Sequence, residues 1–380
     1  MRRSRKWIFT LAAVCLFLFC GQYLPEEPLK SKAMAVGFGI DLTGKETVSI
    51  HLQILTGSGS KQQSGSNTRV LSAEGATLGE AAYKISRKTG LAVSLTHCNV
   101  VILGESLLKS PSVYAVLNYL ICNGYLSDNA CLISCKGSAG DLLSSPIGFG
   151  GNASVYIREI IGMYDSFGDI TGKKLREFVV DYHRHGQANW LPFVTRKKIS
   201  EEIPPSSGGE EKENKEENYL FEMNKVAVLV KNKFVGVWDA PGAVAVNCLL
   251  NKISKGQIQT IGEHGEKIDW YVLKNDCKMS YDKENLKVNA DLKVQALVKE
   301  IIDYSEDNAH VDRLFVTKEE EKRFEKDLAD IISAFYSEMQ KKNADVFGFK
   351  EGFFSHCRID LEDVPLSEIG LEVKVELTRT

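Results

Sequence analysis

The sequence predicts an α/β (α+β) protein of three domains, each a mixed β-sheet with helices packed on it, behind an N-terminal signal or anchor segment. Apolar residues alternate along several stretches, as they do in strands with one buried face. Amphipathic helical patterns with capping signals lie between these stretches. About 360 residues follow the N-terminal segment, which is enough for two or three domains.

Residues 1–24 form the predicted signal peptide or membrane anchor. Four cations occupy positions 2, 3, 5 and 6, and residues 7–24 carry no formal charge. A positive flank before a short apolar core is typical of an export signal. A helix over residues 7–24 would be about 27 Å long, which is marginal for spanning a bilayer. The segment is therefore either cleaved or kept as a weak anchor, and in both cases the remainder is expected outside the cytoplasm.

Cys20 is the candidate lipidation site, because a cysteine at the end of an export signal can carry diacylglycerol on its thiol. Lipoprotein signals usually have a small residue just before this cysteine and an aliphatic residue three positions back. Here Phe19 and Phe17 occupy these positions. Lipidation of Cys20 and retention of residues 7–24 as an anchor therefore remain alternatives.

The charge balance argues against a nucleic-acid partner. Removing residues 1–20, which carry four cations and no acids, takes the formal net charge from −3 to −7. Such a chain has no general attraction to polyanions. Nine cysteines are present without a CxxC pair, and most lie in apolar runs where cysteine behaves as a small hydrophobic residue.

The N-terminal domain is expected over residues 25–146. Residues 33–41 and 46–56 predict a hairpin, since Val48, Ile50, Leu52 and Ile54 alternate with polar residues. Further strands are expected at 69–74, 93–103 and 130–135. Helices are expected after Thr77, where Glu80 completes a capping box, and at 112–123. The glycine-rich residues 57–67 predict a solvated loop.

The middle domain is expected over residues 147–243. Two helices are predicted at 154–164 and 171–182, then an edge strand at 190–194 and a hairpin at 221–238. Residues 200–218 contain many glutamates and almost nothing apolar, so they predict a disordered acidic insertion.

The C-terminal domain is expected over residues 244–380. It begins in a helix that starts at Pro241 and continues through strands at 257–261, 267–276, 278–281 and 286–298. The longest helix is predicted at 317–342, where Thr317 and Glu320 form a second capping box. Its core stripe is Phe324, Leu328, Ile331, Phe335 and Met339. Gly348 is expected to cap this helix, and a last strand is expected at 370–379.

No catalytic, cofactor-binding or metal-binding residue is predicted. The seven histidines form neither HxxxH nor HExxH, and no GxSxG occurs. His183 and His185 could begin a metal site, but a polar helix end is the preferred interpretation because their nearest carboxylate, Asp181, lies beside a cation.

Several stretches in one order resemble the spore-germination Ger(x)C family, the C-subunit lipoproteins of germinant receptors. They are AVGFGID at 35–41, SAEG at 72–75, ISRK at 85–88 followed by His97, VAV at 226–228, VGVWD at 235–239, LNK at 250–252, ADVFGF at 344–349 and VKVELTRT at 373–380. In this family Gly37 and Gly39 are expected to allow close backbone approach.

The resemblance implies a three-domain α/β protein that is lipid-anchored on the outer face of the spore inner membrane. It implies partners in the membrane, an A subunit and a permease-like B subunit, and neither catalysis nor a cofactor. The alternative from the residues alone is an anchored extracytoplasmic solute-binding or hydrolytic protein. A deep pocket with converging His, Asp or Glu side chains would favour that alternative.

Overall fold

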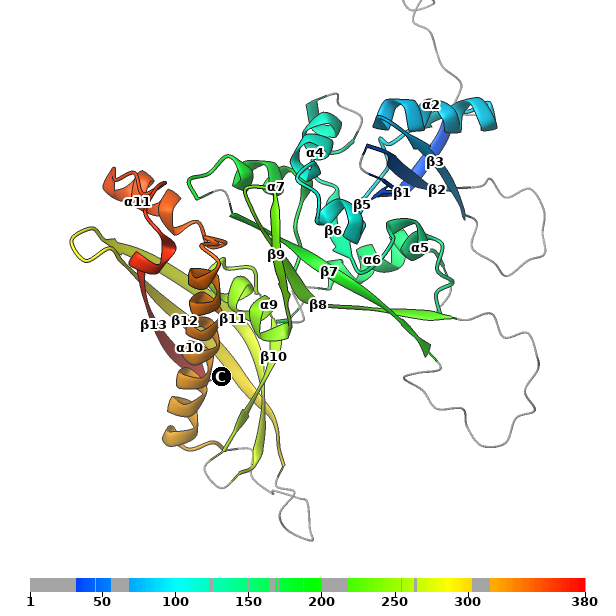
Figure 1. The fold of residues 1–380 in the computed structure, drawn as a ribbon. Helices are drawn as coiled ribbons and strands as arrows, with labels where there is room; N and C mark the ends of the chain where they lie inside the picture. The colour runs from blue at the N-terminus through cyan, green and yellow to red at the C-terminus, as the bar shows by residue number, and fades with distance from the viewer. Residues whose placement is uncertain are drawn as a thin grey trace, which may run out of the picture.

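The structure is a computed structural model with two β-sheets and helices packed against them (Figure 1). It describes residues 32–44, 46–55, 68–122, 126–148, 151–163, 168–169, 171–186, 188–199, 218–253, 255–262, 265–302 and 315–379. The predicted signal or anchor at 1–24, the loop at 57–67 and nearly all of the acidic insertion at 200–218 lie outside these residues.

The first sheet has nine strands in the order β3-β2-β1-β5-β6-β7-β8-β9, and β4 also pairs with β1. The strands β1, β4, β5, β6 and β7 run parallel where they pair, and the outer pairs are antiparallel. Their bounds are β1 Lys32–Leu42, β2 Val48–Leu55, β3 Thr68–Gly75, β4 Ala92–Ser94, β5 Val100–Leu103, β6 Cys131–Cys135, β7 Ala188–Lys198, β8 Tyr219–Val230 and β9 Lys233–Trp238.

Helices cover both faces of this sheet, so its central strands are apolar on both sides. In β5, Val101 and Leu103 point into one hydrophobic cluster while Val100 and Ile102 point into another. This double burial is typical of parallel strands. The helices are α2 Leu78–Thr89, α3 Glu105–Leu108, α4 Val113–Cys122, α5 Ala139–Leu143, α6 Ala153–Gly162 and α7 Leu175–Tyr182.

The second sheet has the order β10-β11-β12-β13, in which only the β12–β13 pair is parallel. Its strands are β10 Gly256–Ile261, β11 Lys267–Asp282, β12 Lys287–Ile302 and β13 Gly370–Arg379. Along β12 every second residue is buried, as the alternating pattern predicts: Val288, Ala290, Leu292, Val294 and Ala296. The helix α10, Lys318–Lys341, packs across this buried face through Phe324 and Leu328.

One hydrophobic cluster joins the two sheets. The helix α9, Ala240–Leu249, is buried at nearly every position from Gly242 to its end and lies between them. Trp190 of β7 and Val226 and Val228 of β8 pack into the same cluster as Trp270 of β11. The far part of the first sheet and the second sheet therefore share a core.

The mixed α/β class and the principal elements are confirmed, with differences in detail. The strand expected at an edge over 190–194 is instead part of β7, which pairs with β6 on one side and β8 on the other. Thr317 caps α10 with the full capping box to Glu320. The buried stripe of α10 uses Ile332 instead of Ile331, because Ile332 continues the four-residue spacing of Phe324 and Leu328. The strands expected at 267–276 and 278–281 are one strand, β11, with bulge-like register shifts.

The expectation that Gly348 caps the long helix is wrong. The helix α10 ends at Lys341, and Gly348, with φ of 71°, is the N-cap of the next helix, α11, Phe349–Cys357. The backbone there must enter a new helix from the left-handed region, which glycine adopts without strain. Asp345 then accepts hydrogen bonds from the backbone N–H groups of Phe349 and Lys350.

The predicted division into domains at 146/147 and 243/244 stays a prediction. The strands β6 and β7, on either side of residue 146, pair with each other. The division at 243/244 falls inside α9.

Candidate functional site

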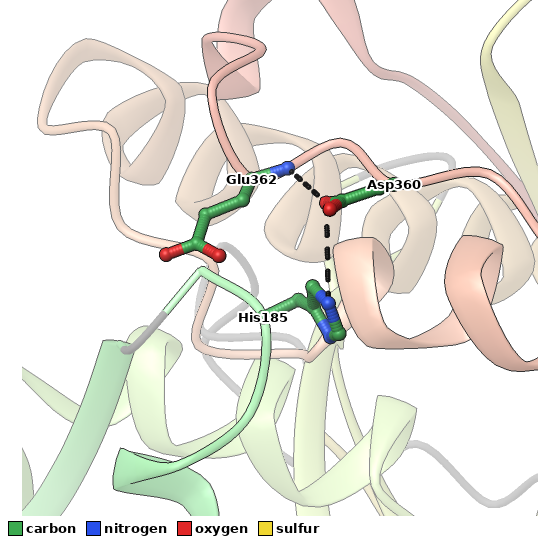
Figure 2. Close-up of side chains that lie close together, drawn as sticks. All are labelled: His185, Asp360 and Glu362. Carbon is green, nitrogen blue, oxygen red and sulfur yellow. Dashed lines mark hydrogen bonds and ion pairs between the residues drawn. The ribbon is translucent and has the colours of Figure 1, made fainter.

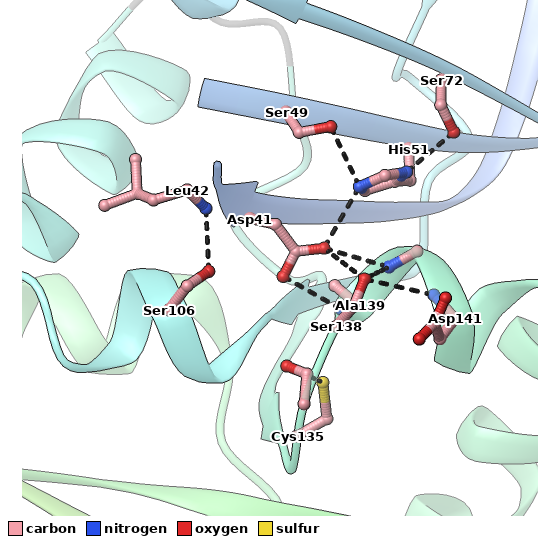
Figure 3. A network of polar contacts seen from close by, with 12 residues as sticks. Asp41, Leu42, Ser49, His51, Ser72, Ser106, Cys135, Ser138, Ala139 and Asp141 are labelled. Atoms are coloured by element: carbon pink, nitrogen blue, oxygen red, sulfur yellow. Dashed lines mark hydrogen bonds and ion pairs between the residues drawn. The ribbon is translucent and has the colours of Figure 1, made fainter. Parts of the chain in front are cut away.

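A polar network lies where β1 ends, at the carboxyl edge of the parallel strands (Figure 3). It joins Asp41 of β1, His51 of β2 and Ser72 of β3 to Ser138, the N-cap of α5. These residues come from distant parts of the chain and converge because β1 pairs with both β2 and β5, and β5 pairs with β6. Ligand sites in α/β sheets occur at this kind of edge.

Asp41 is the centre of the network and is buried. Its Oδ2 accepts hydrogen bonds from the Ser138 hydroxyl at 2.8 Å and from the backbone N–H of Gly140 at 3.2 Å, while Oδ1 accepts from the Ala139 N–H at 3.1 Å. Burial by itself would raise the pKa of this carboxyl. The hydrogen bonds from His51, Ala139, Ser138 and Gly140 outweigh burial, so the pKa lies below its ordinary value.

His51 connects Asp41 to two serines. Its Nε2 lies 3.1 Å from Asp41 Oδ2, and its Nδ1 lies 2.7 Å from the hydroxyl oxygen of Ser72. Because the carboxylate only accepts, Nε2 donates to Asp41, and in this tautomer of the neutral ring Nδ1 is the atom that can accept from Ser72. Ser49 Oγ also approaches Nε2, at 3.2 Å. The order Ser72, His51, Asp41 is the order of a serine–histidine–aspartate relay.

The network fits only because two neighbouring residues are glycines, which have no side chain to fill its space. A Cβ on Gly104 would lie 1.6 Å from Asp41 Oδ1, and a Cβ on Gly140 would lie 2.6 Å from the His51 ring. Larger residues at either position would displace Asp41 or His51. The close contact fixes both side chains against the backbone at the end of β5 and the start of α5.

An open depression of about 530 Å³ lies over the network. Its lining includes Asp41, Ser49 and His51 together with Glu105 and Lys109, which form an ion pair at 2.6 Å. Ser72 is exposed, whereas Asp41 is engaged by four donors. The arrangement can hold a serine hydroxyl beside a basic nitrogen, and it also ties the strands β1, β2 and β3 to the start of α5.

A second cluster joins the loop after α7 to the region around α11 (Figure 2). His185 Nδ1 lies 2.8 Å from Glu351 Oε2, and Nε2 lies 3.9 Å from Asp360 Oδ1. The hydrogen bond to Glu351 raises the pKa of His185 despite the opposing effect of burial. His185, Asp360 and Glu362 each offer a ligand atom within 4.8 Å of the others and could hold a cation. The Nδ1 atom of His185 is already bonded to Glu351, and the carboxylates of Asp360 and Glu362 are exposed. The cluster can therefore equally be an ion-paired contact between the loop after α7 and the region around α11.

The sequence-based interpretation of the 183–185 histidines was incomplete. His183 bonds to the Tyr114 hydroxyl, and Asp181 pairs with Lys173 and Arg184 as the neighbouring cation suggested. The carboxylates beside His185 come from residues 351–362, too far along the chain for spacing to find them. The role of His51 was missed for the same reason, since Asp41 and Ser72 lie on other strands. The alternating apolar residues of β2 did show that His51 lies on one face of a sheet.

The predicted lipidation site Cys20 lies outside the described residues. The seven cysteines of the described part are free thiols. Within that same part, no helix is both long and apolar enough to cross a membrane.

Two family models match consecutive parts of the chain. Residues 25–196 match the spore germination protein N-terminal domain, and residues 224–380 match the spore germination B3/GerAC-like C-terminal domain. This chain belongs to the spore-germination Ger(x)C family. Germinant-receptor C subunits make up this family, so spore germination is the process in which the chain is placed.

The fold of this Ger(x)C protein is also similar to a solved one. The crystal structure of the GerBC protein aligns with a TM-score of 0.51 and 18% sequence identity, over 90% of this chain and 96% of that chain. At this identity the likeness concerns the fold. No match to a curated protein was found.

Proposed function

We propose that this Ger(x)C protein is a non-catalytic, membrane-tethered subunit of a spore germinant receptor. It would support nutrient-triggered germination by docking to the membrane-embedded A and B subunits. The observation that carries the proposal is the pair of family matches, which together take in most of the chain in one order. The fold similarity to the GerBC protein, which covers 90% of this chain, supports the same proposal.

Docking needs a rigid surface and a high local concentration. Two sheets that share one core through α9 supply rigidity, because a continuous packed cluster resists bending between them. An N-terminal tether confines the chain to the membrane that holds its partners, which raises the effective concentration of the docking surface. The tether is either a diacylglyceryl group on Cys20 or residues 7–24 retained as an anchor, on the outer face of the spore inner membrane.

The runner-up is an anchored hydrolytic protein, and the specific observation that favours it is the relay from Ser72 through His51 to Asp41. Two features favour a structural role instead. The carboxylate oxygens of Asp41 accept hydrogen bonds from backbone N–H groups at the start of α5. His51 presents Nδ1 to Ser72, whereas serine hydrolases use Nε2 for the nucleophile.

Complementation of spores that lack the chain separates the two functions. Wild type and Ser72→Ala are expected to restore nutrient-triggered germination equally, and a trigger that bypasses the receptor should work in all strains. Ser72 is exposed, so its substitution is not expected to unfold the chain. Labelling of Ser72 by a fluorophosphonate, together with loss of germination in Ser72→Ala, would establish the hydrolytic function and overturn the proposal.

The docking itself is tested by affinity purification of the detergent-solubilised chain from spore membranes. The A and B subunits should co-purify with the wild-type chain in proportionate amounts. Their absence from a preparation in which the chain is intact and folded would contradict the role as a receptor subunit.

A further inference from the structure

The beginning of β1 and the end of α2 form a basic pole in an otherwise acidic protein. Residues 81–104 contain Lys84, Arg87, Lys88 and His97 but neither Asp nor Glu, although the chain has 50 of these acids among 380 residues. The β1 residues 32–40 are also free of acids. The described carboxylates on and next to α2, those of Glu74 and Glu80, lie at the opposite, first-turn end of the helix.

Strand pairing brings these two acid-free stretches together. Lys32, the first described residue, pairs in parallel register with Ala92, two residues beyond the Gly90 cap of α2. The chain that comes from the predicted tether therefore enters the fold beside the last turn of α2. Figure 1 places α2 and β1 at one end of the molecule and α10 with the second sheet at the other.

The outward side of α2 is free to meet another surface. Leu78, Ala81 and Ile85 are its buried residues. Tyr83 is 66% exposed and lies one turn before Arg87, so the two share a face. Arg87 and Lys88 are exposed, and among the described residues neither forms an ion pair or a side-chain hydrogen bond.

We propose that this surface, made of Tyr83, Arg87 and Lys88, faces the membrane and binds anionic lipid headgroups. Lys84 is not part of it, because its ammonium pairs with Glu80 at 2.6 Å. The proposal rests on the membrane tether of the proposed function. It fixes the orientation of the subunit, with the first sheet close to the membrane and the second sheet away from it.

The length of the tether supports this orientation. Eight residue steps separate position 24 from Lys32, and a fully extended chain covers at most about 28 Å over that distance. If the lipid is on Cys20 the limit is about 42 Å. Connectivity thus keeps the α2 end of the first sheet within that distance of the surface, and a basic residue that reaches the surface strengthens association with anionic lipid roughly fivefold. A tyrosine beside the basic residues suits the membrane interface.

A purely structural explanation exists for two of these residues. Basic side chains in the last turn complement the helix dipole of α2. That role would be the same in every lipid, so the dependence on lipid charge distinguishes the two explanations.

The test uses the full chain reconstituted into vesicles, with the photoreactive p-benzoyl-phenylalanine in place of Tyr83. Phe315 is the matched control position, because it is 76% exposed and lies three residues before α10, the helix at the far end. After irradiation, lipid adducts are quantified by mass spectrometry in phosphatidylcholine vesicles with and without phosphatidylglycerol. Adducts are expected at position 83 but not at 315, with several-fold more when phosphatidylglycerol is present.

The charge dependence is tested with two double variants. Arg87→Glu with Lys88→Glu should reduce the adducts at position 83 at least tenfold and remove their dependence on phosphatidylglycerol. Lys322→Glu with Lys326→Glu, an equal reversal on exposed positions of α10, should leave them unchanged. Equal adducts at 83 and 315, or none at 83 in chains that sediment with the vesicles, would overturn the proposed surface. Chains that fail to sediment with any vesicle would instead overturn the tether on which it rests.

Discussion

Replacing Asp41 by Asn keeps the size of the side chain but removes the charge that four hydrogen-bond donors share. Asn retains one oxygen, which can continue to accept from the Ala139 N–H. Its NH₂ group would then face the donors that Oδ2 now satisfies, those of His51, Ser138 and Gly140. The substitution therefore replaces attraction by donor–donor contact inside a buried site.

The magnitude follows from these bonds. A hydrogen bond to a charged group contributes about 1.5–3 kcal/mol, and a buried donor left without a partner costs about 1–3 kcal/mol. His51 can change tautomer and the Ser138 hydroxyl can rotate, which recovers part of the loss. We expect Asp41→Asn to lower the free energy of unfolding by about 2–4 kcal/mol.

The effect should depend on pH in a defined direction. The pKa of Asp41 is lowered in the folded chain, so its stabilisation is fully present above the unfolded pKa of about 3.9. It is lost as the pH falls through the lower folded pKa. The difference in stability between wild type and Asp41→Asn should therefore be large at pH 6 and shrink as the pH approaches 3.

Urea unfolding followed by far-UV circular dichroism measures the change, and hydrogen exchange of β1 and α5 locates it. Tryptophan fluorescence is unsuited, since the described tryptophans pack in or against the hydrophobic cluster that joins the two sheets, and the network at Asp41 lies outside that cluster. The control is Asp141→Asn, an exposed carboxylate in the first turn of α5. If Asp41→Asn is within about 0.5 kcal/mol of this control at pH 6, the network does not hold the strands β1, β2 and β3 to α5.

Three further predictions concern the rest of the fold. The His185–Glu351 pair should stabilise the chain most between about pH 4.5 and 6.5. This follows because the pKa of His185 is raised, so its contribution is lost as pH rises, while that of Glu351 is lowered and lost as pH falls. His185→Ala should cost on the order of 0.5–1 kcal/mol at pH 5.5 and less at pH 8, and equal cost at both would contradict the pairing. Thr317→Ala should lower the stability by about 1 kcal/mol through loss of the α10 capping box, with Thr317→Ser close to wild type in thermal unfolding. Phe324→Ala should cost about 3–5 kcal/mol by opening a cavity beside Trp270, and a loss below 1 kcal/mol in urea would contradict the packing of α10 on the second sheet.

Local patterns predicted the elements of the fold well. The alternation in β12 and the Thr317–Glu320 box each depend on residues a few positions apart, so the sequence displays them directly. The glycines at 37 and 39 also behave as expected. A Cβ on Gly37 would lie 1.8 Å from Ser154 Oγ, and one on Gly39 would lie 3.0 Å from Ala139.

Contacts between residues far apart in the chain could not be predicted from the sequence. The network at Asp41 needs residues from β1, β2, β3 and the start of α5, and the pair at His185 needs a glutamate 166 positions away. No local spacing encodes either arrangement. Gly348 was misplaced because the chain makes an extra turn between α10 and α11, with Asn343 at φ of 50°. A glycine after a helix indicates a left-handed residue but not which helix it serves.

The most direct test of the tethered-subunit account is the intact mass and membrane partitioning of the chain from sporulating cells, with wild type compared to Cys20→Ala. The account predicts a wild-type chain in the membrane fraction that carries a diacylglyceryl mass, and an unmodified variant released from the membrane. An unmodified full-length chain that stays in the membrane in both strains would assign the tether to residues 7–24. A wild-type chain that is unmodified and soluble would contradict the account.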